Sequence, residues 1–248
     1  MFEYKNHIQG LRAFAVFFVI IYHLNQSLFQ FGFLGVDIFF VISGYVITQS
    51  ILKNFDKNKN LNIINFYIKR FKRLYPSLIF VTLFTFFLYL IFGTLENFNV
   101  IVKSFLSSLL SISNFYFLRI EYNYFNEIFN NPYLHTWSLG VEDQFYLIYP
   151  IILLFFLKTR ILKYFLHFLF LISLIYFLLI DQFFNPLTRF WEMFLGCLTF
   201  LYLGSAKQIT LGRIIKPLSY ILFLISFYFA YYLYYQASIL VVCAATTL

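Results

Sequence analysis

The sequence predicts an all-α fold, a polytopic bundle of transmembrane helices. Two observations carry this prediction. Hydrophobic residues make up 62% of the 248 residues and charged residues only 11%, whereas a soluble domain carries about 25% charged residues. The apolar residues also fall in runs close to the length of about 20 residues that crosses a bilayer as a helix. The composition therefore excludes an ordinary soluble domain.

Seven apolar runs are long enough to span a bilayer, and they lie at residues 11–29, 35–52, 75–94, 139–157, 164–181, 188–204 and 217–235. A further run begins at residue 237 and reaches Leu248 without a polar stop, so the transmembrane helical bundle is expected to hold seven to eight spanning helices. We expect one membrane domain over residues 1–248, incomplete at its C-terminus, and no soluble domain. No small-residue cleavage site follows the first run, which argues against a cleavable signal peptide.

The run at residues 100–118 has two interpretations. It is long enough to cross the bilayer, yet it contains Lys103, several serines and Asn114. The basic residues distinguish the two interpretations, because cytoplasmic links carry an excess of Lys and Arg. The link at 53–73 carries seven of them, which predicts that this link and the N-terminus are cytoplasmic.

A re-entrant or interfacial segment at 100–118 leaves fifteen of the eighteen basic residues on the cytoplasmic side. We therefore predict that this segment does not cross and that 119–138 faces the periplasm, where a cysteine at Asn123 should react with an impermeant maleimide. The net charge of +8 is mostly a topology signal. No aromatic-interleaved basic face belongs to a soluble domain, so no nucleic-acid partner is expected.

Three ionisable residues interrupt the first two apolar runs. An ionisable side chain in hydrocarbon is costly, so it indicates a functional site. Arg12 and His23 are eleven residues apart, which places them on one helix face, about 16 Å apart along the axis. Asp37 opens the second run. It could orient His23, since a carboxylate holds a histidine in one tautomer as a neutral base, or it could favour the helix start through the dipole.

Two pairs of charged residues have both a structural and a functional interpretation. Arg70 and Arg73 stand at i and i+3 in KRFKR, where they act either as a juxtamembrane anchor or as a fork that binds phosphates. Arg189 and Glu192 have the same spacing and form either an internal ion pair or part of a site.

The tract from residue 132 to 150 opens a helix with two acids, Glu142 and Asp143, in its first turns. The helix dipole favours acids there without any chemistry. Ser138 precedes them, and it is not expected to be a nucleophile because no base stands at a usable spacing.

Four stretches, in order along the chain, resemble the integral-membrane acyltransferase family 3, the O-acetylases of bacterial surface glycans. They are the spacing of Arg12 and His23 followed by GFLGVDIFFVISGYVIT, then KRFKRLYP, PYLHTWSLGVEDQFYLIYP and TRFWEMFLGCLTFLYLG. Members of this family usually have about ten spanning helices, so the resemblance implies a truncated member. It also implies an acyl-CoA donor, expected to be acetyl-CoA, and no metal.

The resemblance implies roles for most of these polar residues. His23 is the base that takes the proton of the attacking hydroxyl, and Glu142 and, by the geometric argument above, Asp37 belong to the catalytic centre. Three arginines are assigned to the acyl-CoA donor: Arg12, Arg70 and Arg73. The residues assigned to the acceptor sugar are His135, Trp137, Ser138, Arg189 and Glu192.

The predicted function is a membrane O-acyltransferase of the bacterial inner (cytoplasmic) membrane. It would move an acyl group, expected to be acetyl, from cytoplasmic acyl-CoA to a hydroxyl of a carbohydrate such as lipopolysaccharide O-antigen, peptidoglycan or exopolysaccharide. Its expected partners are membrane lipid, the carbohydrate acceptor and acyl-CoA.

The alternative function is a proton-coupled transporter in which His23 and Asp37 relay protons. A phosphate-binding arginine fork separates the two functions, because a transporter has no need of one. An inactive truncated form is also compatible with the sequence. Cys197 and Cys243 lie in apolar runs and are expected to be buried, with neither a disulfide nor a metal.

Overall fold

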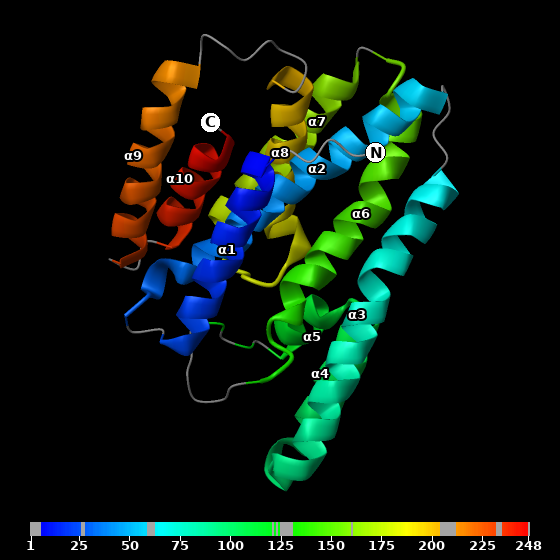
Figure 1. The fold of residues 1–248 in the computed structure, drawn as a ribbon, viewed down its shortest axis with the longest axis vertical. Helices are drawn as coiled ribbons and strands as arrows, with labels where there is room; N and C mark the ends of the chain where they lie inside the picture. Colours follow the sequence, from blue (N-terminus) through cyan, green and yellow to red (C-terminus); the bar gives the residue numbers. More distant parts are fainter. Residues whose placement is uncertain are drawn as a thin grey trace. The chain divides into compact units, whose positions relative to one another are not determined.

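The computed structural model of the chain describes residues 6–25, 28–58, 63–120, 122, 124, 131–159, 161–203, 212–231 and 235–247. These residues form helices and no strand, so the predicted all-α class is confirmed (Figure 1). Asn123, the predicted labelling position, lies outside the described residues. The elements are α1 (Asn6–Leu24), η1 (Gln30–Phe33), α2 (Leu34–Asn58), α3 (Ile63–Phe92), η2 (Leu95–Asn97), α4 (Phe98–Leu109), α5 (Ser113–Arg119), α6 (Thr136–Phe156), α7 (Ile161–Leu179), η3 (Pro186–Thr188), α8 (Phe190–Leu203), α9 (Gly212–Tyr231) and α10 (Tyr235–Thr247).

Apolar helices dominate the described residues. By length and composition, four segments can cross a membrane: Gln30–Phe55, Ile63–Phe92, Thr136–Phe156 and Ile161–Leu179. Four shorter apolar helices accompany them: Ile8–Leu24, Phe190–Leu203, Leu218–Ala230 and Tyr235–Thr247. This set of helices is that of a membrane bundle.

Several helices begin earlier than the hydropathy predicts. α1 covers Asn6–Leu24 instead of 11–29, and α3 begins at Ile63 instead of residue 75. A hydropathy run stops at charged residues, but Lys and Arg are good helix formers, so α3 continues through the basic stretch. Arg70 and Arg73 therefore stand on α3 itself and not in a link before it.

The stretch at 100–118 is a helical hairpin. Its two helices, α4 and α5, are separated at Leu110–Ile112, where Ser111 has a φ of 54°. The Tyr116 hydroxyl donates to the carbonyl of Val100 at 3.4 Å, so α5 returns alongside α4. Neither helix reaches the length of about 20 residues that spans a bilayer. This shape is the one that a re-entrant segment requires, and the segment's place in the membrane stays a prediction.

The chain forms two compact units. The first comprises Met1–Leu52, Lys163–Ile172 and Trp191–Leu248, and the second comprises Lys53–Leu162 and Ser173–Phe190.

In the first unit, α2 and α8 cross with their backbones in direct contact. A Cβ on Gly44 would lie 1.9 Å from the carbonyl oxygen of Met193, and a Cβ on Gly196 would lie 2.0 Å from that of Val41. The Sγ of Cys197 donates to the Gly44 carbonyl at 3.4 Å. Small residues allow such close packing of membrane helices. As expected, Cys197 is buried, and so is Cys243.

In the second unit, α3 and α6 run antiparallel and are joined by polar bonds. The Tyr67 hydroxyl donates to the carbonyl of Leu147 at 2.8 Å. Further along, the Tyr133 hydroxyl donates to the carbonyl of Thr82 at 3.1 Å. Burial raises the pKa of Tyr133, which keeps its hydroxyl protonated as a donor.

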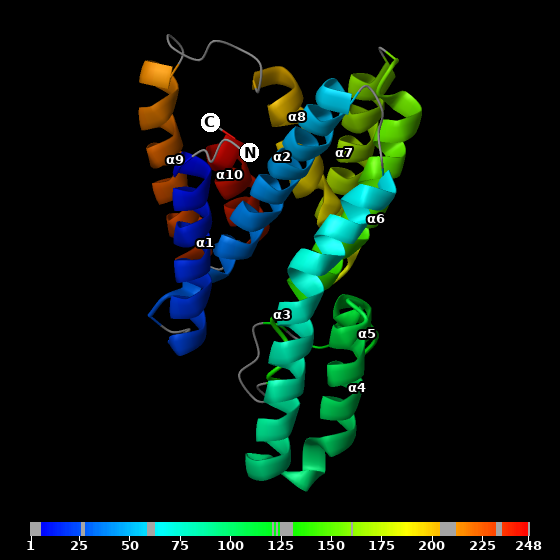
Figure 2. The same ribbon diagram turned by 45° about the vertical axis from the view of Figure 1, so that its right-hand side comes forward.

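The α4–α5 hairpin is attached to both of these helices. Phe105 on α4 stacks on Phe86 of α3 with ring centroids 4.6 Å apart, and α4 follows the C-terminal half of α3 in both views (Figures 1 and 2). α5 contacts α6. The hairpin therefore packs against both α3 and α6, near the end of the second unit at which α6 begins.

Candidate active site

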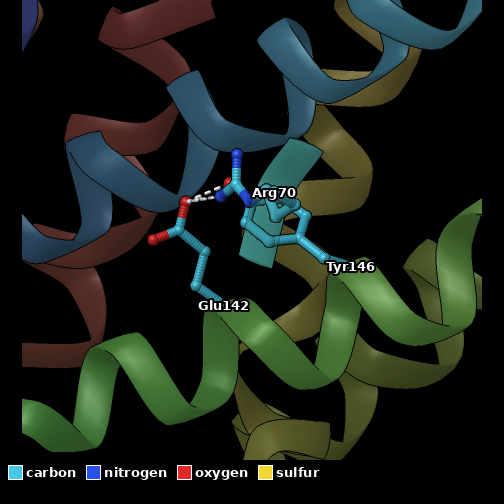
Figure 3. Close-up of polar contacts among 3 residues, drawn as sticks. All are labelled: Arg70, Glu142 and Tyr146. Carbon is cyan, nitrogen blue, oxygen red and sulfur yellow. Dashed lines mark hydrogen bonds and ion pairs between the residues drawn. The ribbon is translucent and has the colours of Figure 1, made fainter. Parts of the chain in front are cut away.

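The second unit holds a charged cluster between α3 and α6. A guanidinium nitrogen of Arg70 lies 3.2 Å from a carboxylate oxygen of Glu142, and each side chain is 21% exposed. The Tyr146 hydroxyl donates to the same carboxylate, and the Arg70 guanidinium lies 3.5 Å from the centroid of the Tyr146 ring. Figure 3 shows the three side chains converging from the two helices.

This cluster follows from helical spacing. Glu142 and Tyr146 are four residues apart on α6, so their side chains share one face. Arginine suits the position opposite because its planar group can bond a carboxylate and stack on an aromatic ring at the same time. The sequence analysis gives Tyr146 no role in the site and so misses this contact. Its i+4 spacing from Glu142 was the available signal.

The two arginines of the predicted fork have different surroundings. Arg70 is paired with Glu142, whereas Arg73 is exposed one turn further along α3. The Nε of Arg70 is buried and has no hydrogen-bond partner among the described residues. The Nε–H of Arg70 is thus a donor that the ion pair does not use. Phosphate binding by the two arginines stays a prediction.

His23 lies in the last turn of α1 and is partly buried. Its Nδ1 lies 2.7 Å from the carbonyl of Val19. Because a carbonyl only accepts, Nδ1 carries the proton in the neutral ring, and Nε2 is left with a lone pair. His167 makes the same bond to Lys163 at 2.7 Å, so this bond does not by itself mark a base.

Asp37 and Arg12 belong to the same unit as His23. Asp37 is 2% exposed and lies in the first turn of α2, where the helix dipole favours an acid. Arg12 is partly exposed, with an Nε that has no hydrogen-bond partner in the described ranges. The proposed support of His23 by Asp37 stays a prediction, as does the assignment of Arg12 to the donor.

The predicted acceptor residues at the start of α6 differ in access. His135 is exposed just before the helix, and the Ser138 hydroxyl donates to its carbonyl at 3.2 Å. Trp137 is 1% exposed and packs on Phe183 and Phe184, with ring centroids 5.0 and 5.5 Å away. A sugar could touch Trp137 only if this aromatic cluster opened.

Arg189 and Glu192 are both buried, at 1% and 0% exposure. The Nε of Arg189 donates to the carbonyl of Phe183 at 3.2 Å, and its guanidinium lies 4.4 Å from the centroid of that ring. Arg189 belongs to the second unit and Glu192 to the first. Their pairing, and their contact with the acceptor, therefore stay predictions.

No three His, Cys, Asp or Glu side chains gather closely enough to hold a metal ion in the part of the chain that the structure describes. The polar groups of the second unit are instead organised around α3, α6 and the hairpin.

A bundle of apolar helices that holds a partly buried ion pair defines the class, a polytopic membrane protein with a polar site. The sequence profile of the family described as "Acyltransferase domain" matches residues 6–248. The chain therefore belongs to this family, which agrees with the resemblance found in its motifs. No solved structure gives a significant match.

Several curated relatives support this membership. The O-acetyltransferase OatA of Staphylococcus aureus (strain NCTC 8325 / PS 47) is 34% identical over 207 residues, which are 79% of this chain and 34% of that protein. The peptidoglycan O-acetyltransferase OatA of Listeria monocytogenes serovar 1/2a is 42% identical over 157 residues, 63% of this chain and 25% of that protein. A putative O-acetyltransferase of S. aureus (strain MSSA476) is 40% identical over 174 residues, 68% of this chain and 28% of that protein. The chain spans about a third or less of the length of these relatives.

Proposed function

We propose that the protein is a membrane O-acyltransferase that moves an acetyl group from cytoplasmic acetyl-CoA to a sugar hydroxyl of a cell-envelope glycan, with peptidoglycan as the first acceptor to test. The family match over residues 6–248 carries this proposal. The relative from Listeria, which is named for peptidoglycan O-acetylation, favours peptidoglycan over lipopolysaccharide or exopolysaccharide.

The chemistry needs one base and one donor site. The sugar oxygen attacks the thioester carbonyl carbon, so a C–O bond forms and the C–S bond breaks. Nε2 of His23 takes the hydroxyl proton and then gives it to the departing thiolate, which leaves as free coenzyme A. The Nδ1–H bond to the Val19 carbonyl supports this assignment because it leaves Nε2 as the basic nitrogen.

Arg70 and Arg73 are proposed to hold the phosphates of the donor. Both stand on the N-terminal part of α3, within the basic stretch at 53–73. Guanidinium groups bind phosphate oxygens in pairs of hydrogen bonds. On this proposal, Glu142 keeps the Arg70 side chain extended toward the site when no donor is bound.

The base assignment is tested by His23→Ala and His23→Gln. We expect each variant to lower glycan acetylation by about 100-fold or more, because a general base contributes about 10²–10⁴-fold to the rate. The measurement is mass spectrometry of envelope glycans from cells with equal amounts of membrane-inserted protein. His167→Gln is the matched control, since His167 makes the same helix bond. Full acetylation in His23→Ala would remove His23 from the mechanism.

The proposed topology places residues 119–138 on the periplasmic side and the link between α6 and α7 on the cytoplasmic side. It is tested by cysteine labelling in a background without Cys197 and Cys243. Ile120, 42% exposed after α5, replaces Asn123 as the outward probe. Thr159, exposed between α6 and α7, is the inward probe. We expect Ile120→Cys to react with an impermeant maleimide on intact spheroplasts and Thr159→Cys to react only after lysis. The opposite pattern would overturn the proposed topology.

A further inference from the structure

Two side chains of α6 bond two other parts of the second unit. Glu142 bonds Arg70 on α3. Gln144 bonds Asn114 on α5 and donates to the Ser111 carbonyl at the tip of the α4–α5 hairpin at 3.5 Å. Successive residues of a helix are rotated by about 100°, so these contacts hold α6 over roughly 200° of its circumference.

The contact between Gln144 and Asn114 is reciprocal. The Gln144 amide donates to Asn114 Oδ1 at 2.8 Å, and the Asn114 amide donates back to Gln144 Oε1 at 3.3 Å. Asn114 is 0% exposed. Buried amides that satisfy each other in this way are costly to separate, because each would leave donors and acceptors unpaired.

The tip of the hairpin lies directly against the α6 backbone. A Cβ on Gly140 would lie 2.8 Å from Asn114 Oδ1 and 3.0 Å from the Ser111 carbonyl oxygen. Ser111 has a positive φ and is 7% exposed. The unusual backbone of Ser111 and the missing side chain at residue 140 together bring the hairpin into contact with α6, just before Glu142.

Lipid does not set the rotation of a helix such as α6. Lipid tails are as apolar as the side chains that face them, so specific polar and packing contacts must fix which side chains face inward. A rotation of α6 by one residue step would carry Glu142 away from Arg70. The contacts of Gln144 with the hairpin oppose that rotation.

We infer that the α4–α5 hairpin is the positioning device of the active site, with Asn114 and Ser111 as positioning residues that hold Glu142 toward Arg70 through α6. The inference rests on the proposed acyltransferase function only for its kinetic consequence. The structural part, the dependence of the α3–α6 contact on the hairpin, stands independently of the reaction.

The structural part is tested by cross-linking in the full chain, reconstituted in liposomes. Cysteines replace Arg70 and Glu142 in a background without Cys197 and Cys243, and a short bifunctional maleimide joins them. We expect Asn114→Leu to lower the cross-linked fraction several-fold. The exchange Asn114→Gln with Gln144→Asn keeps the amide pair and should restore it. Unchanged cross-linking in Asn114→Leu would overturn the inference.

A matched control comes from the same unit. Asn185 donates to Gln182 Oε1 at 2.7 Å and is 9% exposed, so Asn185→Leu also removes a partly buried Asn–Gln bond, but one in which neither α6 nor the hairpin takes part. We expect Asn185→Leu to leave the cross-linked fraction unchanged. An equal loss in both variants would show a general loosening of the unit and would overturn the specific role of the hairpin.

The kinetic part uses acetyl transfer to a soluble glycan acceptor. We expect Asn114→Leu to raise KM for acetyl-CoA by about tenfold, because Arg70 is proposed to bind the donor phosphates, with kcat changed by less than about threefold. In a Glu142→Gln background, Asn114→Leu should cost little more, because residues that act through one group are not additive. Additive losses would overturn the inference. A wild-type protein that acetylates no glycan would overturn the proposed function and leave the cross-linking result standing.

Discussion

The α2–α8 crossing and the α3–α6 contact hold pairs of membrane helices together by opposite means. At the first, Gly44 and Gly196 remove side chains so that backbone meets backbone. At the second, Arg70 and Glu142 place charged side chains between the helices. Close packing depends only on the shapes of the two helix surfaces. A polar contact depends on how the donor and acceptor groups are oriented, and the Arg70 Nε–H remains as a donor without a partner among the described residues. The comparison teaches that a glycine crossing fixes the distance between two membrane helices, whereas a charged contact fixes which side chains face each other.

The largest expected effect comes from filling the glycine crossing. Gly196→Val should lower the free energy of unfolding in detergent by about 3 kcal/mol or more, because overpacking against an immovable backbone exceeds the usual cost of 1–3 kcal/mol. The control is Gly10→Ala, since nothing lies within 4 Å of a Cβ at Gly10. That variant should be neutral or gain at most about 1 kcal/mol. Similar stabilities for the two variants would show that the crossing is not rigid.

The second effect is the loss of one partner of the ion pair. Arg70→Ala should destabilise by about 1–2 kcal/mol, less than the 3–5 kcal/mol of a fully buried pair, because both side chains are 21% exposed. The double variant Arg70→Ala with Glu142→Ala should recover about 1 kcal/mol of the summed losses. Thermal or chemical unfolding in detergent measures both. If the loss in the double variant equalled the sum of the two single losses, the ion pair would contribute nothing to the free energy of unfolding.

Arg73→Ala is the control for that cycle. Arg73 is exposed on the same helix, so its loss should change the free energy of unfolding by no more than about 0.5 kcal/mol. Acetyl-CoA binding should nevertheless weaken in Arg73→Ala and, less strongly, in Arg73→Lys, which keeps the charge but loses the paired hydrogen bonds. Unchanged donor affinity in both variants would leave Arg73 as an anchor of the helix.

Within the charged cluster, the smallest effect is expected from Tyr146→Phe. The ring under Arg70 is kept and only the hydroxyl that donates to Glu142 is lost. We expect a loss of about 1 kcal/mol in the free energy of unfolding. Tyr164→Phe is the control, because Tyr164 is 77% exposed and should give no measurable change. Equal effects of the two changes would remove the hydroxyl from the cluster.

The sequence by itself determined the class of the protein and its family. Hydropathy tests each segment separately for the length and apolar character of a helix that spans a bilayer. The apolar helices could therefore be found without knowing which helices pack beside them. The largest error of the hydropathy prediction lies at the basic start of α3. There the charged residues end the apolar run, but the helix continues through them. The motifs around Arg12, His23 and Glu142 led to the acyltransferase family that the family match confirms.

Only the tertiary structure decided which polar side chains meet. Arg70 and Glu142 are 72 residues apart, and Asn114 and Gln144 are 30 apart, so no local pattern announces either contact. The serines of α4 and α5 indicated that their segment is unusual, but not that Ser111 breaks it at a positive φ. The physical reason is that an apolar helix has almost the same free energy in lipid at every rotation about its axis. The rotation that points Glu142 toward Arg70 is set by contacts that exist only when α3, α6 and the hairpin are packed together.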